Sequence, residues 1–187
     1  MLRAATAEAH QSLEARLVLL GPELDRRRYA QYLMALLCVV EPLERALLQV
    51  AGIRSAWPDL FERQKAVQLR RDLAELDHAA PNTPPLRFGG ELDQSIPDTA
   101  TALGIGYVLE GSMLGGEVLR REIVRRLGSV PTWYFTCYGS YLRVRWATFL
   151  AQLEAARLDE PEAQLISGAR FAFTAVERTL MERGLIR

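Results

Sequence analysis

A segment near the N-terminus carries side chains that could bind a metal. Arg3, His10 and Glu14 lie seven and four residues apart, so they share one face of a helix. The imidazole could bind a metal ion or a haem iron while Glu14 orients the ring, and Arg3 could pair with an anionic group of the ligand. The alternative is an ordinary, partly buried histidine hydrogen-bonded to Glu14. The residues alone favour that alternative, because most histidines are not ligands.

Four glycines lie in an apolar segment that otherwise predicts a helix. They are Gly106, Gly111, Gly115 and Gly116, in the run GYVLEGSMLGGEVL. Each glycine costs a helix interior about 0.8–1 kcal/mol relative to alanine. Either something therefore approaches this backbone closely, or the helix bends there.

Other signatures of chemistry are weak. His78 lies where a helix is expected to end, and no second ligand follows it at a useful spacing. The sequence has no pair of Glu-x-x-His motifs of the sort that ferritin-like bundles use, no nucleophile elbow and no phosphate loop. Cys38 and Cys137 stand alone in apolar and aromatic surroundings, which indicates buried thiols and not a disulfide or metal pair.

Six or more helices are expected to position these residues. Apolar residues recur at three- and four-residue steps, strand-like alternation is nearly absent, and Pro42 should bend or interrupt the second helix. A long irregular connection is expected over 78–91. The predicted helices run from Leu2 to Leu20, from Asp25 to about Val50, from Ser55 to near Asp77, from Pro97 to Gly128, from about Cys137 to Leu158, and from Asp159 to Gly184.

The length of the chain fits one domain spanning residues 1–187, and the helical periodicity makes that domain all-α. The 23 basic and 23 acidic side chains cancel, which argues against a nucleic-acid or anionic-membrane partner. The longest apolar run, Leu33 to Val40, is too short to span a bilayer, and the N-terminus lacks the apolar stretch of a signal peptide. We therefore expect a cytoplasmic protein.

Four segments resemble motifs of the haem oxygenase family. LRAATAEAHQSLE (2–14) resembles its proximal helix, and YVLEGSMLGG (107–116) resembles its distal helix, particularly in the bacterial enzymes associated with bacteriophytochromes. YAQYLMALLCVVEPLE (29–44) and YGSYLRVRWATFLAQL (138–153) resemble its second helix and a later one. The resemblance implies a single-domain, multi-helical fold that holds haem between the proximal and distal helices.

The resemblance also implies roles for individual residues. His10 would be the iron ligand and Glu14 its partner, while Arg3, Arg143 and, less closely, Arg145 would pair with the haem propionates. On the distal helix, Gly111 and Gly115 would leave space for oxygen, and Gly116 would let the helix bend. Mammalian members carry an aspartate at Ser112, where the most similar bacterial members have serine, and a propionate-binding tyrosine at Gly106, for which Tyr107 could substitute.

The activity implied is the oxidative cleavage of haem to biliverdin, carbon monoxide and ferrous iron. Haem would be both substrate and prosthetic group, and ordered water near Gly111 and Ser112 would deliver protons. The partners implied are O2, a ferredoxin or reductase as electron donor, and a bacteriophytochrome as a candidate recipient of biliverdin. Two alternatives stay open, a non-catalytic haem carrier or sensor on the same fold and a helical domain that binds no haem.

Overall fold

The computed structural model describes residues 2–16, 21, 24–80, 82, 96–156, 158–159 and 161–186. These residues are almost entirely helical, which confirms the all-α prediction. The α-helices are α1 (Leu2–Arg16), α2 (Arg26–Leu47), α3 (Ile53–Ala56), α4 (Ala66–Glu75), α5 (Thr99–Leu127), α6 (Leu142–Ala155) and α7 (Glu162–Glu182), and two 3-10 segments, η2 (Leu60–Arg63) and η3 (Gly139–Tyr141), lie between them.

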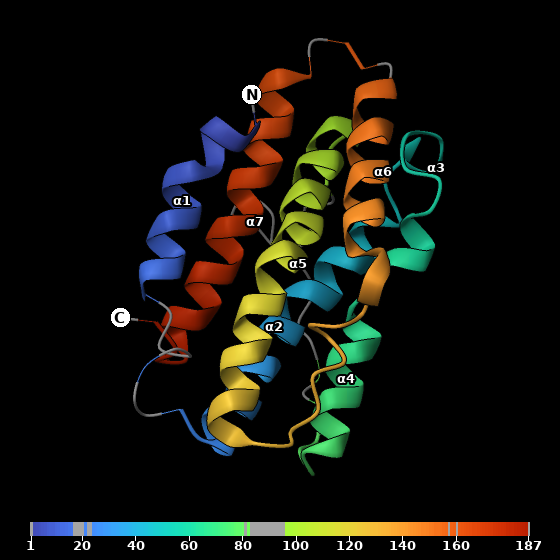
Figure 1. Ribbon diagram of the computed structural model, residues 1–187. Coiled ribbons are helices and arrows are strands. Elements are labelled where there is room, and N and C mark those ends of the chain that lie inside the picture. Colours follow the sequence, from blue (N-terminus) through green and yellow to red (C-terminus); the bar gives the residue numbers. More distant parts are fainter. Residues whose placement is uncertain are drawn as a thin grey trace.

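Helices α1, α2 and α5 pack against helix α7. Figure 1 shows α1 on one side of α7 and α5 on the other, and α2 also contacts α7. Helix α1 is held by one stripe, in which Leu2 and Thr6 are buried and Ala9 and Leu13 are half-buried. The three- and four-residue spacing of this stripe confirms the amphipathic pattern, and the rest of α1 stays exposed.

The backbones of α5 and α7 touch where two glycines meet. A Cβ added to Gly104 would lie 2.1 Å from the carbonyl oxygen of Leu165, and one added to Gly168 would lie 2.1 Å from that of Thr101. No side chain fits at either position, so both glycines are required for this crossing. The crossing fixes α5 against α7 a short distance before the glycine-rich segment of α5.

Gly168→Ala should therefore lower the melting temperature by several degrees. Overpacking a tight core typically costs about 1–3 kcal/mol. The control is Gly115→Ala in α5, where nothing lies within 4 Å of the added Cβ. Helix propensity alone should leave that variant at least as stable as the wild type. Equal melting temperatures for the two variants would contradict the close crossing.

Several predicted helix boundaries are confirmed by their capping contacts. Asp25 accepts a hydrogen bond from the backbone N–H of Arg28 at 2.7 Å, and Asp98 accepts one from Thr101 at 2.7 Å. Gly128 ends α5 with φ of +73°, a value that favours glycine. Pro42 lies inside α2 without ending it. The predicted end of the first helix, at 17–20, and most of the connection over 78–91 lie outside the described residues.

Two predicted helices were wrong in extent. The third is broken into α3, η2 and α4, because the carboxylate of Glu44 accepts hydrogen bonds from the backbone N–H groups of Lys65 (2.5 Å) and Ala66 (3.1 Å) and so starts a new helix there. The fifth begins at Leu142 and not at Cys137, because Gly139, with φ of +49°, opens a 3-10 turn first.

Candidate functional site

The exposed face of α1 presents His10 between two neighbours. The side chain of His10 is 55% exposed, and its Nδ1 lies 3.5 Å from a carboxylate oxygen of Glu14. The ring of Phe173, from α7, meets the imidazole edge-on with 6.2 Å between ring centroids. These contacts orient the ring, and no described residue hydrogen-bonds Nε2. His10 therefore offers one nitrogen to a ligand, in an orientation that Glu14 and Phe173 hold.

The four glycines of α5 have different surroundings. An added Cβ would clash with Trp57 at Gly106 (2.4 Å), and would touch Trp146 at Gly111 (3.5 Å) and Phe135 at Gly116 (3.3 Å). At Gly115 no atom lies within 4 Å. The helix continues unbroken past all four positions. Three glycines thus admit aromatic rings close to the backbone, and Gly115 alone among them faces open space.

Tyr107 of α5 is half-buried beside α6. Its ring lies against Trp146 of α6, with 5.3 Å between ring centroids. Burial raises the pKa of Tyr107, and the positive charge of Arg3 lowers it in part. Tyr107 is therefore near enough to α1 to respond to the charge of Arg3.

His10 and the distal glycines lie on helices that run in the same direction. In Figure 1, α1 and α5 run in the same direction, downward from the end marked N. His10 follows Arg3 by seven residues, a rise of about 10 Å, and Gly111 and Gly115 follow Tyr107 by four and eight residues, a rise of about 6–12 Å. His10 shares a helix face with Arg3, and the glycines share one with Tyr107. We refer to these five residues, together with Glu14, as the candidate site: Arg3, His10, Glu14, Tyr107, Gly111 and Gly115.

The two arginines of α6 differ in their partners. Arg143 is exposed and makes no ion pair with any residue that the structure describes. The guanidinium of Arg145 is held by Asp59 at 3.0 Å and by Glu62 at 3.3 Å. Arg143 is therefore available to a ligand, whereas Arg145 fastens α6 to the segment around η2.

The polar residues next to the glycines are already engaged. Ser112 is exposed, and its hydroxyl donates to the carbonyl oxygen of Leu109 at 2.9 Å. Hydrogen bonds from Arg120, with further contributions from Arg121, lower the pKa of Glu117 to about 2, so this carboxyl is ionised at neutral pH. Glu110 is buried and bound by cations, as described below.

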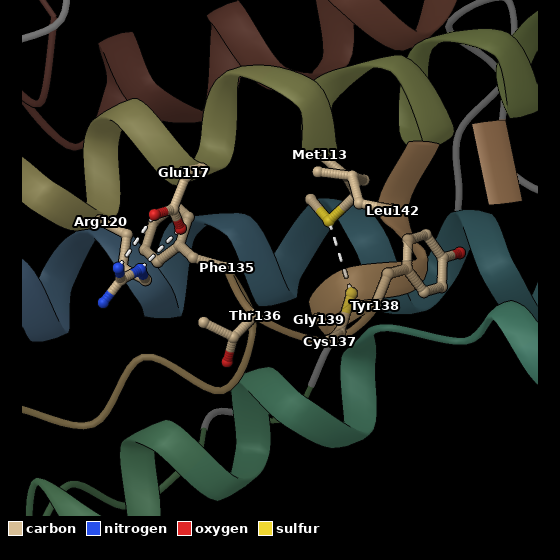
Figure 2. A pocket seen from close by; sticks show the side chains of 9 residues that line it. All are labelled: Met113, Glu117, Arg120, Phe135, Thr136, Cys137, Tyr138, Gly139 and Leu142. Atoms are coloured by element: carbon tan, nitrogen blue, oxygen red, sulfur yellow. Dashed lines mark hydrogen bonds and ion pairs between the residues drawn. The ribbon is translucent and has the colours of Figure 1, made fainter. Parts of the chain in front are cut away.

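A cavity of about 290 Å³ lies on another side of α5, against the segment that leads into α6 (Figure 2). Met113 and Glu117, which line it, each follow a distal glycine by two residues and so point about 200° away around the helix. The Sγ of Cys137 lies 3.6 Å from the Sδ of Met113. This cavity is separate from the candidate site. The described residues contain no cluster of three or more His, Cys, Asp or Glu side chains able to hold a metal ion.

Sequence reasoning did not identify two aromatic residues of the site. Phe173 orients His10, and Trp146 covers Gly111 and lies against Tyr107 with the two ring planes tilted by 56°. Nothing in the sequence around Trp146 or Phe173 sets either residue apart from an ordinary apolar position. Their roles depend on contacts between helices that are distant in sequence.

Comparisons with known proteins identify the family and the fold. The model of the family described as "Heme oxygenase" matches residues 1–182. The fold is similar to that of the NO- and CO-bound haem oxygenase from Neisseria meningitidis, with a TM-score of 0.79 and 23% identity over 98% of this chain and 90% of that one. A search of curated proteins gave no match. Membership of the bacteriophytochrome-associated subgroup stays a prediction. Within the described residues, no helix is long and apolar enough to cross a membrane.

Proposed function

Since the chain belongs to the haem oxygenase family, we propose that it cleaves haem oxidatively to biliverdin, carbon monoxide and ferrous iron. One observation carries this proposal. The oriented, half-exposed His10 on α1 and the open Gly115 on α5 belong to two helices that run in the same direction on either side of α7. A histidine on one helix and a position without a side chain on the other suit a flat ligand that needs a metal contact on one side and free space on the other.

The side chains of the candidate site fit haem. The imidazole of His10 has a nitrogen without a protein partner, and aromatic Phe173 lies beside it. Arg3 and Arg143 are exposed cations without an ion pair among the described residues, as two carboxylates of a ligand require.

Each residue has a defined part in the proposed reaction. Bound haem supplies the iron that activates oxygen and the porphyrin that is oxidised. His10 would hold the iron through Nε2, and Glu14 would orient the ring through Nδ1. Gly115 would keep the opposite side free of side chains. Gly111 would let the ring of Trp146 lie close to the backbone, where an added Cβ would be 3.5 Å from the ring, and so close one edge of that space.

Proton delivery in this proposal depends on solvent and not on a side-chain acid. Glu117 is ionised at neutral pH, so its carboxyl cannot act as a proton donor there. Ser112 is exposed next to Gly111, and its oxygen can still accept a hydrogen bond from water. Ser112 would therefore help to hold the water that supplies protons.

Arg3 and Arg143 would anchor the haem propionates, with Tyr107 as a further contact. We do not propose this role for Arg145, because two carboxylates already hold its guanidinium. Arg3→Ala and Arg143→Ala should each weaken haem binding about three- to tenfold. A charge-assisted hydrogen bond contributes about 1.5–3 kcal/mol, and less where water screens it. The measurement is a haem titration at fixed ionic strength.

Arg145→Ala is the matched control for these two substitutions. It removes the same charge from the same helix as Arg143→Ala, but it should lower the melting temperature and leave haem affinity close to the wild-type value. If the Arg3 and Arg143 variants bind haem as the wild type does, or if the Arg145 variant is the one that loses affinity, the assignment of the anchors is wrong.

A non-catalytic haem carrier is the second candidate, and Ser112 favours it. The hydroxyl of Ser112 bonds to the helix backbone, so it does not point a donor at the space beside Gly111. Two steps separate the candidates. Hemin addition should give the spectrum of a histidine-ligated haem protein, and ascorbate under air should then convert that spectrum to one of biliverdin. A stable haem complex after the second step would establish a carrier, and no binding in the first would exclude both functions.

The partners and location follow the same proposal. We propose a cytoplasmic enzyme that receives electrons from a ferredoxin or reductase and passes biliverdin to a bacteriophytochrome. The four arginines after the glycines are less available to an acidic donor than their number suggests. Glu117 pairs with Arg120 and Arg121, and Glu122 pairs with Arg125 and Arg126.

A further inference from the structure

A buried carboxylate immediately precedes the first distal glycine. Glu110 is 1% exposed, and its two oxygens receive Nη1 of Arg63 at 2.6 Å, Nζ of Lys65 at 2.6 Å, and the hydroxyl of Tyr138 at 2.9 and 3.0 Å. The side chain of Arg63 is also 1% exposed, and that of Lys65 is 3% exposed. This cluster fastens α5 to the segment between η2 and α4, one residue before Gly111.

Arg63 extends the cluster to α6. The same Nη1 that binds Glu110 donates to the backbone carbonyl oxygen of Arg145 at 3.0 Å, and Nη2 lies 2.8 Å from Asp59. Asp59 in turn binds the guanidinium of Arg145. One buried cation therefore joins the distal helix to the first turn of α6.

Arg63 joins α5 and α6 at positions next to residues that we propose bind or border haem. Gly111 follows Glu110 on α5. Arg143 and Trp146, the proposed propionate anchor and the ring that covers Gly111, flank Arg145 on α6. A change in the distance between these points would move the propionate anchor relative to the open side of the site.

Stability alone does not account for the cluster. Buried ion pairs are costly to desolvate, and well-packed apolar residues of similar size often stabilise a protein as well or better. Removal of one partner is harmful mainly because it leaves a buried charge alone. The hydrogen bonds of the cluster are directional and so hold α5 and α6 at fixed positions relative to the segment around η2, which apolar packing does not require.

We propose that Arg63 and Glu110 are positioning residues that fix α5 and α6 relative to each other and so determine how haem is seated in its plane. This inference rests on the proposed function. The four meso carbons of the porphyrin lie at its edge, and the one that is cut depends on the rotation of the ring relative to the open space at Gly115. The Arg63–Glu110 contact therefore selects the biliverdin isomer without touching haem.

Glu110→Gln is the primary test, because it removes the charge and keeps the shape. His10 should still ligate the iron. The hyperfine-shifted methyl resonances of the ferric cyanide complex should change, because they report the rotation of haem in its site. The biliverdin isomer ratio under ascorbate should shift about threefold or more, since each 1.4 kcal/mol between two seatings is a factor of ten.

A second variant is used if the single substitution prevents folding. It replaces the three charged residues of the cluster together, as Arg63→Met, Lys65→Met and Glu110→Leu, and so leaves no unpaired cation. Glu44 keeps its backbone donors and Asp59 keeps Arg145 in that protein. Glu117→Gln is the matched control, since it removes a carboxylate from the same helix at an ion pair nearer the surface. The control should match the wild type in methyl pattern and isomer ratio.

The outcomes separate the two proposals. A folded variant with a lower melting temperature but the wild-type methyl pattern and isomer ratio would show that the cluster is merely structural, and would overturn the inference. A wild-type protein that binds haem but forms no biliverdin would overturn the proposed function, while the methyl pattern would still decide the positioning role. A wild-type protein that binds no haem would overturn both.

Discussion

His10→Ala should abolish biliverdin formation and leave the fold intact. Loss of a residue that merely orients a metal ligand typically costs about 10- to 100-fold in affinity or activity, so loss of the ligand itself should cost more. The side chain of His10 is half-exposed, and its removal should change the free energy of unfolding by no more than about 0.5 kcal/mol. The measurements are the ferric haem spectrum, turnover with ascorbate, and the melting temperature of the apoprotein.

Added imidazole should restore part of the wild-type spectrum to the His10→Ala protein, because Phe173 and Glu14 still border the vacated position. The matched control is His78→Ala, which removes the other histidine of the sequence. The Nδ1 of His78 lies 2.8 Å from the carbonyl oxygen of Leu76, just after α4, so this change should leave the haem spectrum as it is. A His10→Ala protein with wild-type spectrum and turnover would exclude His10 as the ligand.

Gly115→Leu should block the binding of carbon monoxide to the ferrous complex and leave the apoprotein stable. The position faces open space, so the leucine side chain has room in the absence of haem. With haem bound, it would occupy the side opposite His10. Ferric haem should still be ligated by His10, with a modest loss of affinity, because overpacking a site costs about 1–3 kcal/mol. Carbon monoxide titration of the reduced complex is the measurement.

Gly115→Ala provides a graded control, since its small side chain should reduce carbon monoxide affinity less than leucine does. Gly168→Leu provides the opposite control, because position 168 is a backbone crossing and the substitution should destabilise the apoprotein. A Gly115→Leu protein that is strongly destabilised but binds carbon monoxide normally would show that Gly115 is a packing position, and the proposed distal side would be wrong.

The sequence predicted those parts of the fold that depend on local signals. Asp25 precedes an apolar periodic segment and caps α2, and Gly128 ends α5, as expected. The predicted start of α5 was Pro97, and its cap is the next residue, Asp98. The third predicted helix was wrong in extent because a residue of another helix interrupts it. Glu44 on α2 binds the backbone of residues 65 and 66, and no local pattern can show that contact.

The candidate site was predictable where its residues share one helix. The spacing of Arg3, His10 and Glu14 placed them on one face, and the structure brings His10 and Glu14 together. The spacing of the glycines could not show that aromatic rings approach three of them and that Gly115 faces open space.

A buried ionic cluster was the least predictable feature. Glu110 is a carboxylate within an apolar segment, and this was a sequence signal for a buried charge. Its partners Arg63, Lys65 and Tyr138 come from positions at least 28 residues away, so spacing could not identify them. Contacts of this kind depend on how the helices pack.

The most direct test of the account is a product analysis of the reduced haem complex under air. The purified protein is loaded with equimolar hemin and supplied with ascorbate, with catalase present to remove free peroxide, and the bilin and carbon monoxide are quantified. The account predicts equimolar biliverdin and carbon monoxide from the wild type, and neither from His10→Ala. Loss of haem colour without biliverdin, or equal yields from the two proteins, would contradict it.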